Sequence, residues 1–189
     1  MAEPVFRSAL ADAPRPQAAN AGLRLSDRSG LAVLDLRGGD PVARSAGGAF
    51  GHGLPTDMNR MTGEGASLAL KLGPDEWLLL GGEGEGPAML AGLDGAFGDE
   101  PHALVDLSMR FAAIEVEGPA RRDVLAAACP VDLHPERAAA GFATRTVFGK
   151  ADVVLAFKAN SILILVNRSF APYVWGLLVE AGREFGVAA

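Results

Sequence analysis

Two segments, ASLALKLGPDEWLLLG at residues 66–81 and ADVVLAFKANSILILV at residues 151–166, decide the fold of this chain. Each consists of an apolar strand, a short polar turn and a second apolar strand, which is the pattern of a β-hairpin. The first turn is Gly73-Pro74-Asp75 and the second is Ala159-Asn160. The two copies lie about 85 residues apart, so the pattern indicates a duplicated unit.

A second pair of similar segments precedes the hairpins. VLDLRGGDPVAR at residues 33–44 resembles AIEVEGPARRDV at residues 113–124, because in each a strand leads through a glycine turn with a proline into a helix. Asp40 is the predicted cap of the first of these helices, with Pro41 at its first position. After each hairpin we expect a further helix, over residues 86–98 and from a predicted cap at Ser169 to Gly186.

The unit therefore reads strand, helix, hairpin, helix, strand. This is the split-βαβ, or ferredoxin-like, layout, in which helices pack on one face of a sheet. We predict an α+β fold of two such units in tandem, with mostly antiparallel sheets. The predicted organisation is an irregular N-terminal tail, a first unit and a second unit, at residues 1–22, 23–108 and 109–189. Residues 51–61, GHGLPTDMNRM, are predicted to be a loop.

The composition excludes several classes of function. A net charge of −6 without a basic stripe argues against a nucleic-acid partner, since phosphate binding needs a basic face. The single cysteine rules out an internal disulfide and fits a reducing compartment. The first twenty residues lack the apolar core of a signal peptide, and no apolar run reaches the length of a membrane span. We expect a soluble, acidic, cytoplasmic protein with no membrane partner.

The segment CPVDLHP, residues 129–135, holds the single cysteine, Cys129, close to His134. A reactive thiol needs a base or a helix N-terminus to lower its pKa, whereas Cys129 follows the predicted helix at its C-terminal end, where the helix dipole disfavours a thiolate. A second cysteine or histidine at ligand spacing is also lacking, which argues against a metal. We interpret the segment as a helix terminus stopped by Pro130, with an interface or chemical role as the alternatives.

Other polar segments offer few candidate sites. The glycine-rich stretches at residues 38–48 and 82–89 lack the spacing of phosphate-binding loops. We therefore predict no catalytic residue, no cofactor and no metal in this chain. Asp106 and Arg110, in VDLSMR, are the best candidates for a ligand pocket because they lie at the junction of the two units, with an ordinary loop salt bridge as the alternative. Trp77 and Trp175 are predicted to be packing anchors.

Several motifs together resemble the gamma subunit of bacterial heterotetrameric sarcosine oxidase. The most specific are the CP-x-DLHP element that follows a GP-x-ARDVL-like helix, and the RSFA-x-Y-x-W element. The resemblance covers roughly residues 22–186. The motifs that carry it are LGPDEWLLL (72–80), VDLSMR (105–110), EGPARRDVLAAACPVDLHP (117–135), Thr144-Arg145-Thr146 and VNRSFAPYVWGLLVEAGREF (166–185).

The resemblance implies a function that composition does not. That enzyme converts sarcosine to glycine and hydrogen peroxide, and releases the one-carbon unit as formaldehyde or as methylenetetrahydrofolate. Its FAD, FMN, NAD and tetrahydrofolate are expected in the other subunits. The gamma subunit is similar in fold to part of the folate-binding glycine-cleavage T-protein, and it is expected to support assembly, mainly against the alpha subunit, with beta and delta also present.

Three hypotheses remain. The first is a noncatalytic assembly subunit of sarcosine oxidase. The second is a free-standing folate-binding or aminomethyltransferase-like protein, in which Asp106 and Arg110 line a pocket. The third is an α+β binding module with another partner. Met109 lies where relatives of this family carry a polar residue, which disfavours a residual folate site. An exposed apolar patch would favour the first and third hypotheses, and a deep polar pocket between the units the second.

Overall fold

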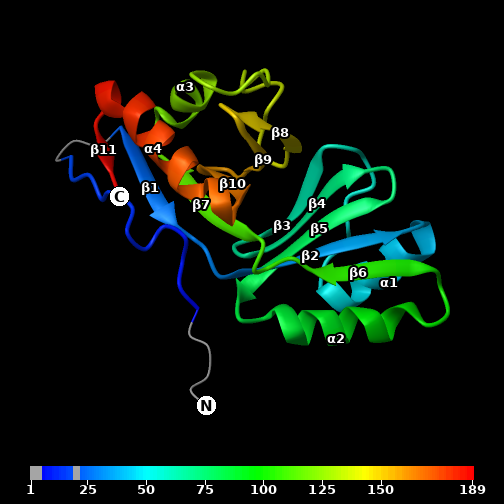
Figure 1. Cartoon of the computed structure of the whole chain (residues 1–189). Coiled ribbons are helices and arrows are strands. Elements are labelled where there is room, and N and C mark those ends of the chain that lie inside the picture. The colour runs from blue at the N-terminus through cyan, green and yellow to red at the C-terminus, as the bar shows by residue number, and fades with distance from the viewer. Residues whose placement is uncertain (1–5, 19–21) are drawn as a thin grey trace, which may run out of the picture.

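Two β-sheets packed face to face form the centre of the molecule, and helices cover the outer face of each sheet (Figure 1). The computed structural model describes residues 6–18 and 22–189. The first sheet has the strand order β3-β4-β5-β2-β6, and the second has the order β11-β1-β7-β10-β9-β8. Neighbouring strands are antiparallel except β1 and β11, which are parallel.

The elements follow the chain in the predicted repeating order. The first sheet contains β2 (Leu31–Gly38), β3 (Arg60–Glu64), β4 (Ser67–Gly73), β5 (Glu76–Glu83) and β6 (His102–Asp106). The second contains β1 (Leu23–Asp27), β7 (Phe111–Glu117), β8 (Ala143–Phe148), β9 (Ala151–Phe157), β10 (Ser161–Asn167) and β11 (Val187–Ala188). The helices are α1 (Asp40–Phe50), α2 (Gly86–Phe97), α3 (Arg121–Ala126) and α4 (Ala171–Ala181), with 3-10 turns η1 (Arg168–Phe170) and η2 (Arg183–Phe185).

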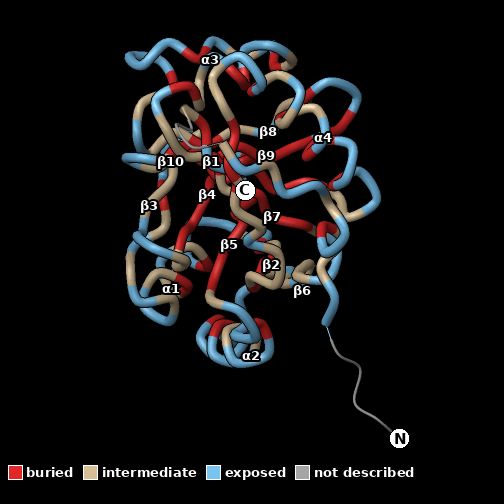
Figure 2. Tube along the Cα trace, turned by 90° about the vertical axis from the view of Figure 1, so that its left-hand side faces the viewer, coloured by how far each residue is buried: buried red, intermediate tan, exposed pale blue. Residues whose placement is uncertain are grey.

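Alternate positions along the strands divide the apolar residues into three cores. The buried residues lie mainly along the strands in the interior of the molecule (Figure 2). Because successive strand side chains point to opposite faces, Val33 lies between the sheets while Leu34 faces the helices of the first sheet. Ala113 and Ile114 have the same two positions in the second sheet. This arrangement explains why the strands read as nearly continuous apolar runs, since both faces of each sheet are buried.

The structure confirms the α+β class and the duplication. The hairpin β4–β5 corresponds to β9–β10, and α1 and α2 correspond to α3 and α4. The predicted hairpin turns and the predicted helix at residues 86–98 lie where the sequence places them. Trp77 and Trp175 are buried packing residues as predicted.

The sheets do not follow the repeats along the chain. If one repeat runs from β1 to α2 and the other from β6 to β11, the first strand of each repeat lies in the sheet of the other. Strand β1 pairs with β7 in the second sheet, and β6 pairs with β2 in the first. The expected first unit, residues 23–108, therefore differs from the first sheet: Leu23–Asp27 belongs to the second. The physical reason is burial, since Leu23 and Leu25 are fully buried in the core beneath α4.

An Asp-x-Ser segment stands at each of the two crossings between sheets. Ser29 Oγ accepts a hydrogen bond from the Ala113 amide at 3.3 Å, and Ser108 Oγ accepts one from the Val33 amide at 3.0 Å. The preceding aspartates, Asp27 and Asp106, each accept from the serine amide, at 3.0 and 2.8 Å. Each segment thus extends a ladder of backbone hydrogen bonds past the end of its strand and satisfies amides that would otherwise lack a partner.

Three local predictions need correction. The predicted loop at residues 51–61 ends in strand β3, which begins at Arg60 and pairs with β4. Helix α1 begins at Asp40 with Gly39 as its cap, so Asp40 lies in the first turn instead. Ser169 caps no helix: it lies inside η1, and Phe170 precedes α4 without a side-chain cap. A 3-10 turn directly before α4 removes the free amides that Ser169 would bind.

The described part of the N-terminal tail, residues 6–18, packs on the second sheet and its helices. Leu10 is fully buried in that core, and the Pro14 carbonyl accepts a hydrogen bond from the Trp175 indole nitrogen at 2.9 Å. Gln17 forms an isolated bridge with Ala188. The segment is irregular as predicted, but its anchors lie within its own chain.

We expect the serines at the crossings to stabilise the fold. Ser108→Ala leaves the buried Val33 amide without its acceptor, which costs about 1–3 kcal/mol, and Ser29→Ala acts on the Ala113 amide in the same way. The free energy of unfolding from urea titrations measures both effects. Ser169→Ala is the matched control, because Ser169 is exposed, and a change within about 0.5 kcal/mol is expected there. Equal stability of Ser108→Ala and Ser169→Ala would contradict this role.

Candidate functional site: a charged cleft between the sheets

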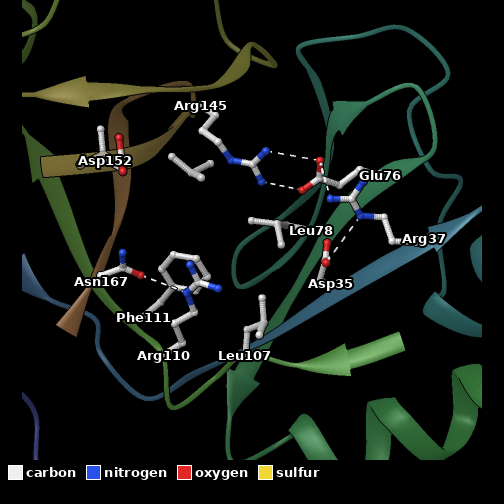
Figure 3. Close-up of a pocket in the computed structure, with 12 residues that line it drawn as sticks. Asp35, Arg37, Glu76, Leu78, Leu107, Arg110, Phe111, Arg145, Asp152 and Asn167 are labelled. Atoms are coloured by element: carbon white, nitrogen blue, oxygen red, sulfur yellow. Dashed lines mark hydrogen bonds and ion pairs between the residues drawn. The ribbon is translucent and has the colours of Figure 1, made fainter. Parts of the chain in front are cut away.

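A cleft of about 340 Å³ opens between the two sheets at the end where β6 crosses into β7 (Figure 3). Its floor is apolar, and its walls carry charged side chains from both sheets. The lining residues are Asp35, Arg37, Glu76, Leu78, Leu107, Arg110, Phe111, Arg145, Asp152, Val153, Val154 and Asn167. It is therefore a polar pocket formed by both halves of the chain.

Glu76 is the buried centre of the charges in the cleft. Its residue is only 5% exposed, and its carboxylate accepts hydrogen bonds from both terminal nitrogens of Arg145, at 2.5 and 3.3 Å. Arg37 Nη2 lies 3.1 Å from the same carboxylate. Arg145 stands on β8 of the second sheet, while Glu76 and Arg37 belong to the first. The fork of Arg145 thus joins the two sheets across the cleft.

The hydrogen bonds to Glu76 also raise the pKa of Arg145 above its ordinary value. They outweigh burial, which disfavours the charged guanidinium. Arg145 is therefore held in its charged form, and its contact with Glu76 links the two sheets.

Asp35 is the incompletely satisfied acid of the cleft. Its Oδ1 atom is buried without a hydrogen-bond partner among the described residues, and its nearest cation is Arg37, at 3.7 Å from Oδ2. Burial raises the pKa of Asp35, and the opposing charge of Arg37 does not compensate for it. An acid of this kind is a candidate ligand contact, because it has an acceptor to offer.

The equivalent acid in the second repeat, Glu115 on β7, is fully paired. It accepts hydrogen bonds from Lys158 Nζ and Ser161 Oγ, both at 2.8 Å, and lies 3.4 Å from Arg28. Burial acts to raise the pKa of Glu115, but these bonds and charges outweigh it and hold the pKa below its ordinary value. The two repeats thus place an acid at the same strand position, but the pKa of Asp35 is raised and the pKa of Glu115 is lowered.

The structure does not bring Asp106 and Arg110 together. Arg110 lines the cleft, where its Nε donates to Asn167 Oδ1 at 3.1 Å and its guanidinium lies over the Phe111 ring. Asp106 instead accepts from Ser108 and borders a separate hollow of about 290 Å³ with Met109. Only three residues separate Asp106 from Arg110 along the chain, and the turn between β6 and β7 directs their side chains to different sides.

Sequence reasoning missed Asp35 and Glu76 as site residues, and it quoted Arg145 for the resemblance alone. The available signal was a charged residue inside an otherwise apolar strand, as Asp35 is in VLDLRG. Because both faces of this strand are buried, a charged side chain on it requires a partner. Local sequence also could not identify the partner of Glu76, because Arg145 lies 69 residues away along the chain.

Cys129 lies in the outer core of the second sheet, 9% exposed, just after α3. His134 is exposed, and its amide donates to Asp132 Oδ1 at 3.0 Å in the turn that follows. This geometry agrees with a helix terminus and a turn. Within the described residues, no group of three potential ligands is arranged to hold a metal ion. The described helices also include none long and apolar enough to cross a membrane.

The cleft offers polar groups that could bind a ligand. Its twelve lining residues include carboxylates and arginines but no serine, threonine, cysteine, histidine or lysine. Two of its arginines and Glu76 are already engaged with one another. The groups available to a ligand include the unpartnered oxygen of Asp35, the exposed carboxylate of Asp152 and the outer nitrogens of Arg110.

The fold is a two-sheet α+β architecture that is also found in a known aminomethyltransferase. The chain superimposes on a glycine cleavage system aminomethyltransferase T from Bartonella henselae with a TM-score of 0.62 at 16% identity, over 85% of this chain and 46% of that chain. At this identity the likeness shows the fold alone. It confirms the expected T-protein-like architecture.

The profile of the sarcosine oxidase, gamma subunit family matches residues 37–184, and this chain belongs to that family. A sarcosine oxidase subunit gamma from Corynebacterium sp. (strain U-96) is 38% identical over 142 residues, which cover 74% of this chain and 68% of the relative. A chain of the heterotetrameric sarcosine oxidase from Corynebacterium sp. U-96 matches with a TM-score of 0.87 at 32% identity, over 97% of this chain and 98% of that chain.

Asp35→Asn is expected to raise the free energy of unfolding at pH 7. Because folding raises the pKa of Asp35, its ionised form destabilises the native state at neutral pH, and the penalty fades as the pH falls through the folded pKa. Urea unfolding at pH 7 and at about pH 4 measures this.

The matched control is Glu115→Gln at the equivalent position. Folding lowers the pKa of Glu115, so its carboxylate stabilises the protein above its unfolded pKa, and this contribution is lost in acid. Glu115→Gln should therefore lower the free energy of unfolding at pH 7. Changes of the same sign in the two variants would show that the surroundings of the two acids do not act on them in opposite directions.

Glu76→Gln is expected to lower the free energy of unfolding by about 1–3 kcal/mol, because it leaves Arg37 and Arg145 facing each other without their shared carboxylate. Asp75→Asn is the control: Asp75 neighbours Glu76 but is exposed, and its loss should cost less than about 0.5 kcal/mol. Chemical denaturation measures both variants. A loss confined to Asp75→Asn would refute the central place of Glu76.

Proposed function

We propose that this chain is a noncatalytic assembly subunit of a heterotetrameric sarcosine oxidase. The observation that carries the proposal is the end-to-end match to a chain of such an enzyme, which leaves almost no part of either chain unpaired. The proposed complex acts in the cytoplasm, where it oxidises sarcosine to glycine and hydrogen peroxide and yields formaldehyde or methylenetetrahydrofolate.

The cleft supports a structural role for this chain. Its buried acid, Glu76, is bound by two arginines, and its lining includes no serine, threonine, cysteine, histidine or lysine. A catalytic centre needs reactive groups held free for the substrate. We propose accordingly that FAD, FMN, NAD and tetrahydrofolate bind to the other subunits, and that the alpha subunit is the main partner, with beta and delta completing the complex.

Exposed apolar side chains support an assembly role. Met109 is 61% exposed and borders a hollow together with Phe6, which is 37% exposed. Arg168 donates to the carbonyls of Arg7 and Met109, so the turn before β7 and the N-terminal segment form one surface. An apolar surface of this kind is suited to burial by a partner.

A free-standing folate-binding or aminomethyltransferase-like protein is the second candidate. The observation that favours it is the polar cleft between the sheets, with the unpartnered oxygen of Asp35 and the outer nitrogens of Arg110. Calorimetric titration of the isolated chain with tetrahydrofolate tests it. Saturable binding that Arg110→Ala abolishes would favour this candidate over the assembly role.

Coexpression of the tagged chain with alpha, beta and delta subunits is expected to give a yellow complex that oxidises sarcosine, because the chain would complete the assembly. The isolated chain is expected to self-associate, since part of its apolar surface would then lack its cover. Flavin absorbance, peroxide production and size-exclusion chromatography measure these outcomes. A stable monomer that does not bind the other subunits would contradict the proposal.

Met109→Asp tests whether this exposed surface contacts the other subunits, because it places a charge there without altering the core. A lower yield of copurified flavin with an unchanged melting temperature is expected. Met58→Asp is the control, since Met58 is also exposed, at 46%, but lies in the loop before β3. An equal effect of both substitutions would point to general insolubility in place of a specific contact.

A further inference from the structure

A second pocket, of about 770 Å³, lies on the helix-covered side of the first sheet, away from the cleft between the sheets. It is bounded by α1, by the loop before β3 and by the ends of β4 and β5. Its lining residues are Asp40, Ala43, Arg44, Gly47, Gly48, Gly53, Leu54, Pro55, Thr56, Lys71 and Trp77. Neither the family assignment nor the assembly role accounts for it.

Lys71 lies in the wall of this pocket as a buried cation without a carboxylate. The residue is 7% exposed, and its ammonium lies 4.3 Å from the centre of the Trp77 ring. Trp77 is held in place because its indole nitrogen donates to the Pro55 carbonyl at 2.9 Å. Among the residues that the structure describes, Lys71 Nζ has neither an ion-pair partner nor a hydrogen-bond acceptor. A cation–π contact offsets only part of the cost of burying an ammonium group.

The helix-covered side of the second sheet also holds a cation over an aromatic ring, but that cation comes from α3 and its hydrogen bonds are satisfied. Phe157 opposes Ile162 in the register of its hairpin as Lys71 opposes Trp77. There Arg122 lies over the Phe157 ring, and its guanidinium donates to the carbonyls of Leu133 and Ala138, both at 2.7 Å. The segment after α3 thus satisfies the cation of the second repeat, whereas the shorter segment after α1 leaves Lys71 open.

The pocket has room and charge for a guest molecule. A side chain added at Gly48 or Gly53 would meet no atom within 4 Å, so these glycines leave space at its mouth. Ala43, Leu54 and Pro55 give it apolar walls. The lining carries two cations, Lys71 and Arg44, against the single carboxylate of Asp40, which favours a monoanion over a dianion.

We propose that this pocket binds a small organic carboxylate. The carboxylate accepts hydrogen bonds from Lys71 at the base of the pocket, and Arg44 at the exposed rim adds a second donor. The hydrocarbon part of the ligand lies against Leu54, Pro55 and Ala43, where it is removed from water. The site needs only residues of the first repeat, so it is independent of the assembly role and of the cleft between the sheets.

Calorimetric titration of the full chain with benzoate tests the proposal, and benzamide serves as the uncharged isostere. We expect saturable binding of benzoate and no binding of benzamide. Lys71→Met, which keeps the length of the side chain but removes the charge, should weaken benzoate binding by about tenfold or more. Lys150→Met is the matched control, because Lys150 is exposed on the other sheet, and it should bind as the unmodified chain does.

Thermal unfolding separates a ligand site from a structural lysine. Benzoate should raise the melting temperature of the unmodified chain but not that of Lys71→Met. Arg44→Gln, an exposed change, should weaken benzoate binding several-fold without altering the fold. Absence of benzoate binding, equal binding of benzamide, or unchanged binding in both Lys71→Met and Arg44→Gln would overturn the proposal.

Discussion

The exchange of one strand between the two sheets is the constraint on which the rest of the structure depends. Each repeat begins with a strand that lies in the sheet of the other repeat: β1 pairs with β7, and β6 pairs with β2. The chain therefore crosses between the sheets twice. At each crossing a serine hydroxyl accepts a hydrogen bond from a backbone amide of the facing strand. Neither sheet is complete without the other half, so the sheets fold against each other as one body.

This constraint also explains where the polar features lie. The crossing from β6 to β7 opens a cleft between sheets that are otherwise joined by apolar residues, and Arg145 and Glu76 close part of it with an ion pair. Duplication supplies each position twice, so the two repeats can diverge. At the duplicated acid position, the second repeat satisfies Glu115, whereas the first leaves an oxygen of Asp35 without a partner. The cations on the helix-covered sides also differ: Arg122 binds two backbone carbonyls, while Lys71 contacts the Trp77 ring.

The fold was largely predictable from the sequence, and the candidate site was not. The hairpins, most of the helices and the duplication followed from apolar periodicity and turn residues, which are local signals. Strand β3 was missed because its sequence, RMTGE, has little apolar character and its edge position tolerates this. Asp106 and Arg110 were correctly placed at the junction, but which side of the turn each faces depends on backbone geometry that no local pattern specifies.

The sequence by itself determined the class of the fold, the repeat and the membership of the sarcosine oxidase gamma subunit family, because these rest on residues that are near one another in the chain or match a family pattern directly. Only the tertiary structure decided which sheet holds β1, which charges meet, and which buried groups remain unsatisfied. Glu76 meets Arg145 and Ser108 meets the Val33 amide across long stretches of chain. Such contacts arise from the packing of whole sheets, and packing is a property of the folded chain and not of any one segment.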